Sequence, residues 1–311
     1  MGDVLTLFVV FLSMFLFGMA ILRIGLYQLS YQNMRKLLAR FADNPVKGML
    51  AGLLMTAVLQ SSSCTMVLTV GLVAVGVLNF KQSIGVILGA NIGTTVTVEL
   101  LSLQHSIPLW PMLIIGAVLL LSKKQSTFGI GSLLFGLGTI FVALHGFSTL
   151  AEPLQRFPIV QESLTATNSY PVLSIVVGAV VTSIIQSSTA ATGIAMAFLQ
   201  EGLFTMPSAI GIMLGANVGT CITAWIASIG TNTEAKLVAM GHIWLNIFGV
   251  VLFAPFLQEL SAFSVLLAHT VSQQLAHISV LFNVLSSLIL LPFITPFSKM
   301  IIYLHGKKRT P

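Results

Sequence analysis

The chain has 311 residues, of which 56% are hydrophobic and 7% are charged, and its mean hydropathy is +1.00. Soluble domains carry roughly 25% charged residues, so this composition excludes a water-soluble globular protein. The formal net charge of +6 comes from basic residues at the ends of hydrophobic blocks, a pattern that suits membrane topology and gives no reason to expect nucleic-acid binding.

The first hydrophobic block covers residues 4–30 and has neither a basic start nor a small-residue cleavage site. We therefore expect a retained helix and not a signal peptide. Arg23 lies in its last two turns, where we expect the side chain to reach the lipid headgroups. The polar stretch 32–45 that follows is too short and too charged to span, so it predicts a helix in the membrane interface.

Two later blocks, 46–78 and 171–204, contain 33 and 34 residues, whereas about 20 residues cross a bilayer. Each is long enough to enter the membrane and return, so we predict two re-entrant helical hairpins. The other blocks then give seven crossings, at 4–30, 82–103, 108–121, 127–149, 207–230, 237–255 and 278–303. The depth of residues 256–277 stays open.

The basic residues orient this arrangement, since cytoplasmic loops are rich in Lys and Arg. We expect the protein in the cell membrane, with the N-terminus outside the cell and the C-terminus in the cytoplasm. In this orientation only Arg156 lies on the outer side. Twelve basic residues fall inside: Arg35, Lys36, Arg40, Lys47, Lys81, Lys123, Lys124, Lys236, Lys299, Lys307, Lys308 and Arg309.

The sequence also repeats itself. Residues 52–97 and 178–223 align without gaps at an offset of 126, with 15 identities over 46 positions, and a weaker match between Leu16 and Leu134 lies at an offset of 118. Three crossings separate the two hairpins, so the repeats have opposite orientations. Inverted repeats with interrupted helices are typical of secondary transporters.

We therefore predict an all-α polytopic membrane protein with two inverted repeats, each containing a re-entrant hairpin and a broken transmembrane helix. Repeat 1 covers residues 1–125, with the broken helix at 82–103. Repeat 2 covers 126–255, with the broken helix at 207–230. Residues 256–311 form a connection, a C-terminal transmembrane helix and a basic cytoplasmic tail.

Polar tips lie in the middle of both hairpin blocks, with the sequences Gln-Ser-Ser-Ser and Gln-Ser-Ser-Thr. A turn at that depth frees backbone groups that need partners, and the second arm begins with a helix N-terminus that can bind an anion. The alternative is that the hydroxyls only satisfy their own helices. The candidate anion-binding residues are Ser61, Ser62, Ser63, Ser187, Ser188 and Thr189.

The spans after the hairpins contain GANIGTT and GANVGTC, which make poor continuous helices. We interpret them as locally unwound segments whose neutral oxygens suit a sodium ion, with Asn91, Thr94, Asn217 and Thr220 as ligands. The alternative is close helix packing through glycines spaced four apart. Glu99 lies in a span with no nearby basic partner, so it is protonated or paired across helices.

The doubled QSS tips, each followed by GANxGT, resemble the type II sodium-phosphate cotransporter family over residues 5–255. The resemblance implies that phosphate binds between the two tips and that sodium binds close by. It also implies that Gln60 and Gln186 complete the sets of residues that surround the phosphate and the sodium. One difference is the threonine at position 189, which keeps the hydroxyl and adds a methyl group.

The expected function is sodium-coupled symport of inorganic phosphate by alternating access, with sodium as coupling ion, the lipid bilayer as surroundings and no cofactor. We expect no arginine near the anion site, and such a site would hold a dianion weakly enough to release it. A homodimer stays open. The alternatives are symport of another oxyanion, an intramembrane serine hydrolase, which needs a base beside one serine, and a non-transporting scaffold.

Overall fold

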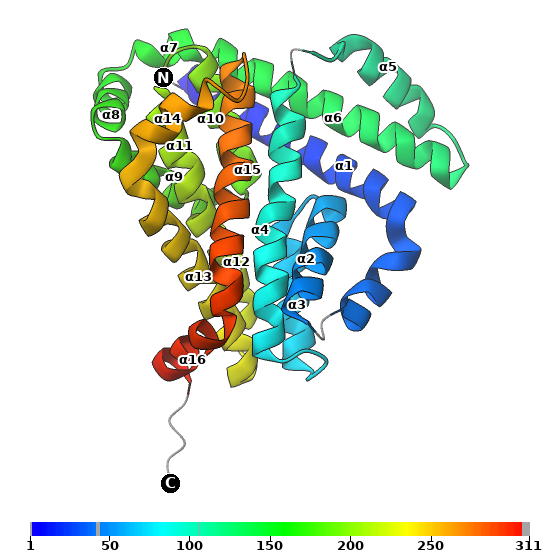
Figure 1. The fold of residues 1–311 in the computed structure, drawn as a ribbon. Helices are drawn as coiled ribbons and strands as arrows, with labels where there is room; N and C mark the ends of the chain where they lie inside the picture. The colour runs from blue at the N-terminus through cyan, green and yellow to red at the C-terminus, as the bar shows by residue number, and fades with distance from the viewer. Residues whose placement is uncertain (1, 42–43, 105, 307–311) are drawn as a thin grey trace.

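The computed structural model describes residues 2–41, 44–104 and 106–306, and the side chains of residues 30–41 lie outside this description. Within these ranges every regular element is helical (Figure 1). Lys307, Lys308 and Arg309 of the predicted cytoplasmic side lie outside the described residues, as do the side chains of Arg35, Lys36 and Arg40.

Six helices lie in the described residues of the first half of the chain. The first block and residues 32–41 of the polar stretch after it belong to one helix, α1. The bounds are α1 Gly2–Phe41, α2 Pro45–Leu59, α3 Ser62–Ala74, α4 Phe80–Ser102, α5 Leu109–Leu120 and α6 Gln125–Thr149.

The second half begins with two short connecting helices and then repeats the hairpin. The bounds are α7 Ala151–Gln155, α8 Pro158–Ser169, α9 Pro171–Ile185, α10 Ser188–Gln200, α11 Met206–Gly219, α12 Cys221–Ser228 and α13 Thr233–Phe253. The remaining helices are a 3-10 turn at Ala254–Phe256, α14 Leu257–Ser264, α15 Val271–Leu290, a 3-10 turn at Leu291–Phe293 and α16 Ile294–His305.

Six segments of the described chain are long and apolar enough to cross a membrane, which confirms an all-α polytopic membrane protein. They are Gly2–Leu29, Phe80–Ser102, Gln125–Gln155, Met206–Ser228, Thr233–Ser264 and Val271–His305. The expected crossing at 108–121 corresponds to α5, which has 12 residues and is therefore only about 18 Å long, short of a hydrocarbon core of about 30 Å. It packs along α6.

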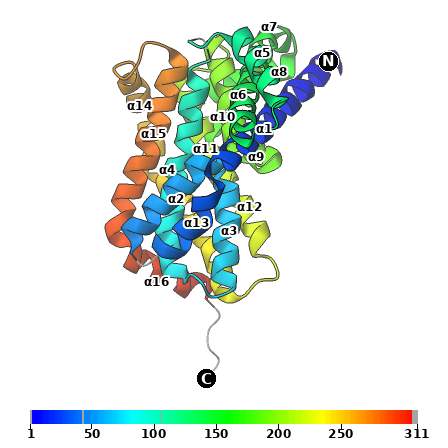
Figure 2. The same cartoon turned by 90° about the vertical axis from the view of Figure 1, so that its right-hand side faces the viewer.

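Both long blocks are helical hairpins, as predicted. The arms of the first have 15 and 13 residues, and so do the arms of the second. At 1.5 Å per residue such an arm is about 20 Å long, too short to cross a bilayer alone. The hairpin α2–α3 lies in the lower half of Figure 1 and α9–α10 in the upper half, and the turned view of Figure 2 keeps this order.

Glycines bring the first arm of each hairpin against the span that follows it. A Cβ added at Gly89 would lie 1.8 Å from the Met49 carbonyl oxygen, and one added at Gly215 would lie 1.9 Å from that of Ile175. Gly52 and Gly178 show the same match, each 2.2 Å from a carbonyl oxygen of the facing helix. The repeat therefore holds residue by residue in the packing of α2 on α4 and of α9 on α11.

Two large buried clusters hold the helices together. One joins α1, α4, α6, α10, α11 and α15 around Phe15, Leu144 and Met196. The other joins α3, α4, α13 and α16 around Met66 and Leu88. Because α4 contributes to both clusters, the hairpins and their spans rest on a common buried framework.

Candidate functional site

The first hairpin turns within two residues, Gln60 and Ser61. Gln60 has a left-handed backbone with φ 49° and ψ 36°, which reverses the chain after α2. Ser61 then caps α3, because its Oγ accepts the backbone N–H of Cys64 at 3.2 Å. Glycine is the usual residue at a left-handed helix end, so a glutamine there carries strain of about 1–3 kcal/mol.

The second hairpin turns in the same way. Gln186 has φ 57° and ψ 29°, and the Oγ of Ser187 accepts the backbone N–H of Ala190 at 3.2 Å. Across the described part of the chain, Gln60 and Gln186 are the two non-glycine residues with positive φ. Strain of this kind collects at functional sites, and here it occurs twice at matching positions.

Each tip presents hydrogen-bond donors in a largely buried setting. Ser62, Ser188 and Thr189 are 8%, 9% and 6% exposed, and Ser63 is half-buried. The N–H groups of a first helical turn lack helical acceptors and carry a partial positive charge. Together with the hydroxyl donors they suit an anion better than a cation at both tips.

The two tips differ in their surroundings. Gln60 is 3% exposed, its Nε2 donates to the Ala57 carbonyl oxygen, and its buried Oε1 has no hydrogen-bond partner among the described residues. Gln186, by contrast, is exposed. The arms of the first hairpin are also tied by a 2.9 Å hydrogen bond from Thr56 to Thr65.

The prediction that the span 82–103 is broken is wrong, because α4 is one continuous helix through GANIGTT. Its glycines serve close packing against α2, which leaves the backbone bonded within the helix. The span 207–230 is interrupted only at Thr220, between α11 and α12, and Thr220 keeps helical angles of −63° and −22°. The expected unwinding is thus absent from the first repeat and limited to one residue in the second.

Side chains of these segments nevertheless keep free oxygen lone pairs. Thr94 and Thr220 donate their hydroxyl hydrogens to the carbonyls of Ala90 and Ala216, at 3.0 and 2.9 Å. Asn217 Nδ2 donates to the Met213 carbonyl oxygen at 2.9 Å. Since the hydrogens point to neighbouring carbonyls, the oxygens remain able to coordinate a cation.

Asn91 belongs to a buried chain of polar contacts that links three helices. Its Nδ2 donates to Asn246 Oδ1 at 3.1 Å, and Asn246 Nδ2 donates to Cys221 Sγ at 3.3 Å and to the His242 carbonyl oxygen at 2.9 Å. Asn91, Asn246 and Cys221 are all at least nine-tenths buried. This network between α4, α12 and α13 was not expected from the sequence.

Arg23 lies at the first tip. Its Nε donates to the Gln60 carbonyl oxygen at 3.3 Å. A cavity of about 550 Å³ adjoins this contact, lined by Arg23, Ile24, Tyr27, Gln28, Leu59, Ser61, Cys64 and Gln125. The expectation of an anion site without a nearby arginine is therefore wrong for the first tip, because α1 packs against α2 and carries Arg23 to the turn.

Comparison with known proteins places this arrangement in a family. The sequence profile described as Na+/Pi-cotransporter matches the chain twice, at residues 14–149 and 144–289. The chain belongs to the Na+/Pi-cotransporter family. This is a family of transporters and not of enzymes, which sets aside the hydrolase alternative, and its double match agrees with the internal repeat.

Relatives of this family member carry different names. YqeW from Bacillus subtilis, named without a function, is 38% identical over 96% of the chain and 97% of its own length. YjbB from Escherichia coli K12, provisionally named as an inorganic phosphate export protein, is 27% identical over 92% of the chain, which spans 53% of YjbB. Human sodium-dependent phosphate transport protein 2B is 30% identical over 41% of the chain and 20% of its own length. No solved structure matches the chain.

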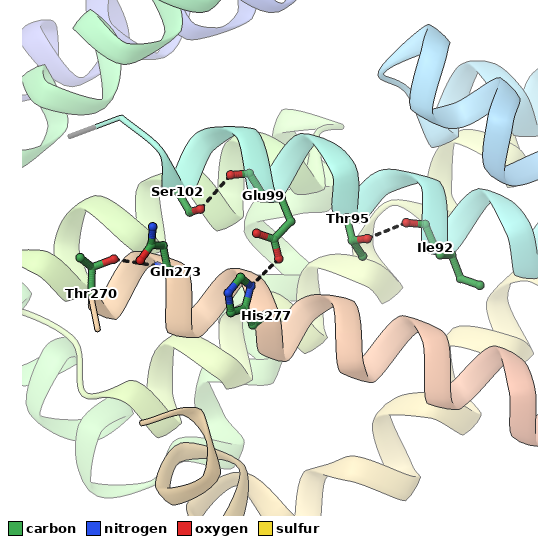
Figure 3. Close-up of polar contacts among 7 residues, drawn as sticks. All are labelled: Ile92, Thr95, Glu99, Ser102, Thr270, Gln273 and His277. Carbon is green, nitrogen blue, oxygen red and sulfur yellow. Dashed lines mark hydrogen bonds and ion pairs between the residues drawn. The ribbon is translucent and has the colours of Figure 1, made fainter. Parts of the chain in front are cut away.

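This Na+/Pi-cotransporter family member also contains a polar contact that the sequence did not reveal. Glu99 Oε1 on α4 lies 2.8 Å from His277 Nδ1 on α15 (Figure 3). The expectation that Glu99 is either protonated or paired across helices is met by this partner. His277 was missed in the sequence analysis because it lies at the border of a hydrophobic block. It is also far from Glu99 along the chain, so no sequence pattern connects the two residues.

Proposed function

We propose that the protein is a sodium-coupled phosphate transporter that binds inorganic phosphate between the two hairpin tips. The observation that carries this proposal is the doubled turn, a left-handed glutamine followed by a capping serine at Gln60–Ser61 and again at Gln186–Ser187. One such turn can be a structural feature of a single hairpin. Two of them at repeat-related positions, in a phosphate transporter family, support a shared binding role.

Phosphate fits the chemistry of the tips. The N–H groups of two helix N-termini and the hydroxyls of Ser61, Ser62, Ser63, Ser187, Ser188 and Thr189 are donors that match the acceptor oxygens of an oxyanion. Arsenate and sulfate offer similar acceptors, so selectivity among oxyanions is part of the test.

The proposed sodium shell uses side-chain oxygens. It consists of Gln60, Asn91 and Thr94 in repeat 1 and of Gln186, Asn217 and Thr220 in repeat 2. The unpartnered Oε1 of Gln60 supports this assignment, because a buried carbonyl oxygen without a donor is costly unless a cation or a donor occupies its lone pairs. Backbone carbonyls contribute little in repeat 1, where α4 is unbroken.

Alternating access follows from the duplicated architecture. Two similar halves of opposite orientation can exchange conformations and expose one site to either side in turn. The two hairpins lie in opposite halves of the molecule (Figures 1 and 2), which supports this reading. In this proposal the N-terminus lies outside and the C-terminus lies in the cytoplasm, as the distribution of basic residues predicts. We propose symport, with the direction of net phosphate flux set by the combined sodium and phosphate gradients.

Purified protein in liposomes tests the proposal. An inward sodium gradient should drive uptake of radiolabelled phosphate, and replacing sodium with choline should abolish it. Unlabelled arsenate and sulfate, added as competitors, define the oxyanion preference. Equal phosphate uptake in sodium and in choline would overturn sodium coupling. Sulfate uptake without phosphate uptake would show that the transported substrate is another oxyanion.

A further inference from the structure

Arg23 gives the proposed site a fixed positive charge on one side only. Its counterpart at the 118-residue offset is Phe141, which is 3% exposed and uncharged. Both residues lie on helices that pack against a hairpin, α1 against the arm α2 and α6 against the arm α10. The repeat counterpart of Arg23 is therefore a buried, uncharged residue.

The Arg23 guanidinium has capacity for a further ligand. It carries five N–H donors, of which Nε–H donates to the Gln60 carbonyl oxygen. Among the described residues no carboxylate lies within ion-pair distance of Arg23. Burying a guanidinium part-way without a counter-ion is costly, so an anion at this position would remove a penalty as well as gain a bond.

The cavity beside the tip connects this charge to the anion-binding donors. Arg23 and Ser61 line the same space of about 550 Å³, together with the exposed Cys64. Gln28 and Gln125 add polar groups to the same wall. A tetrahedral oxyanion in this cavity can therefore contact both the guanidinium and the cap of α3.

We propose that Arg23 is the fixed counter-charge of the site and holds a doubly charged oxyanion against the first hairpin tip. This inference rests on the proposed function for the identity of the anion, inorganic phosphate. It adds a binding residue outside both QSS motifs and makes the site asymmetric, with the dianion closer to the first tip than to the second. Arg23 also orients the tip through the Gln60 carbonyl, so a test must separate charge from positioning.

Binding of phosphate to purified variants provides the first part of the test. Arg23→Gln should weaken phosphate binding at least tenfold, and Arg23→Lys should recover part of the loss, because it keeps the charge without the forked geometry. Arg156→Gln serves as the matched control, since Arg156 is an exposed arginine paired with Glu152 on its own helical turn. Wild-type affinity in Arg23→Gln would overturn the inference, whereas a wild-type protein that neither binds nor transports phosphate would overturn the proposed function instead.

Labelling of Cys64 provides a readout that does not depend on transport. In a Cys221→Ala background Cys64 is the remaining cysteine of the two in the chain. An anionic methanethiosulfonate should react faster, relative to a cationic one, in the presence of Arg23, and Arg23→Gln should lower this ratio severalfold while Arg23→Lys preserves it. Phosphate should slow both reactions. An unchanged ratio in a folded Arg23→Gln protein would show that the guanidinium does not set the potential in the cavity and would overturn the inference.

Discussion

Glu99 on α4 and His277 on α15 form a cross-helix pair, with Oε1 and Nδ1 2.8 Å apart (Figure 3). Glu99 lies one turn from the end of α4 at Ser102, and His277 lies two turns from the start of α15 at Val271. The repeat counterpart of Glu99 is Trp225, so the pair exists in one half of the molecule only. It joins a hairpin-bearing repeat to the C-terminal helices.

The pair should contribute modestly to stability. The pair is one hydrogen bond between side chains that are 33% and 38% exposed, and such a bond contributes about 0.5–1.5 kcal/mol. We expect a coupling energy of that size in a double-mutant cycle of Glu99→Gln and His277→Gln, measured by denaturation in detergent. Additive effects of the two substitutions would show that the contact does not hold α4 and α15 together.

The glycine contacts predict a large and symmetric effect on folding. Gly89→Ala and Gly215→Ala each place a Cβ less than 2 Å from a carbonyl oxygen, at Met49 and Ile175. Overpacking of this kind costs about 1–3 kcal/mol or more, because the facing helix must move.

Gly71→Ala in α3 is the matched control for these substitutions. Nothing lies within 4 Å of its added Cβ, and alanine is favoured over glycine inside a helix by about 1 kcal/mol. The control should be neutral or stabilising in thermal unfolding. Equal stability of all three variants would contradict the packing of α2 on α4 and of α9 on α11.

Topology can be tested with single cysteines in a protein lacking Cys64 and Cys221. Lys124→Cys precedes α6 and Phe157→Cys precedes α8, and one long helix separates them. Because the basic residues place position 124 inside and position 157 outside, an impermeant thiol reagent should label them from opposite faces. Labelling of both positions from the same face would contradict the prediction that the two repeats have opposite orientations.

The proposed sodium ligands predict a specific kinetic change. Thr94→Val and Thr220→Val remove the hydroxyl oxygen while keeping the side-chain shape, so each should raise the sodium concentration needed for half-maximal phosphate uptake several-fold. Phosphate affinity at saturating sodium should change little. Ser132→Ala in α6 controls for loss of a hydroxyl that bonds within its own helix, to the Phe128 carbonyl oxygen. Unchanged sodium dependence in both threonine variants would exclude these oxygens from the coupling site.

The sequence predicted the hairpins well, because their length and their central polar residues are local properties. A block of 33 residues with Gln60–Ser61 in its middle has few other conformations available within a bilayer. The repeat likewise predicted a second turn at Gln186–Ser187, and the structure shows a capping serine at both turns.

Other features depended on contacts that a single sequence does not reveal. GANIGTT predicted a broken helix from its composition, whereas the neighbouring α2 uses the same glycines for close packing and α4 stays continuous. Arg23 was expected at the headgroups because its depth was judged from its own helix, while its bond is to Gln60, 37 residues away. The contacts of His277 and Asn246 depend on how α15 and α13 pack against α4, which the sequence alone does not give.

The central claim is that both tips bind one anion, and binding of phosphate to Ser62→Ala and Ser188→Ala tests it most directly. Each substitution removes a hydrogen bond to a charged ligand worth about 1.5–3 kcal/mol, so isothermal titration should show roughly ten- to hundredfold weaker phosphate binding in both. Ser102→Ala, which loses only a bond to the Glu99 carbonyl oxygen of its own helix, should bind like the wild type. Wild-type phosphate affinity in both tip variants, with folding intact, would contradict the account and leave these serines as turn-forming residues only.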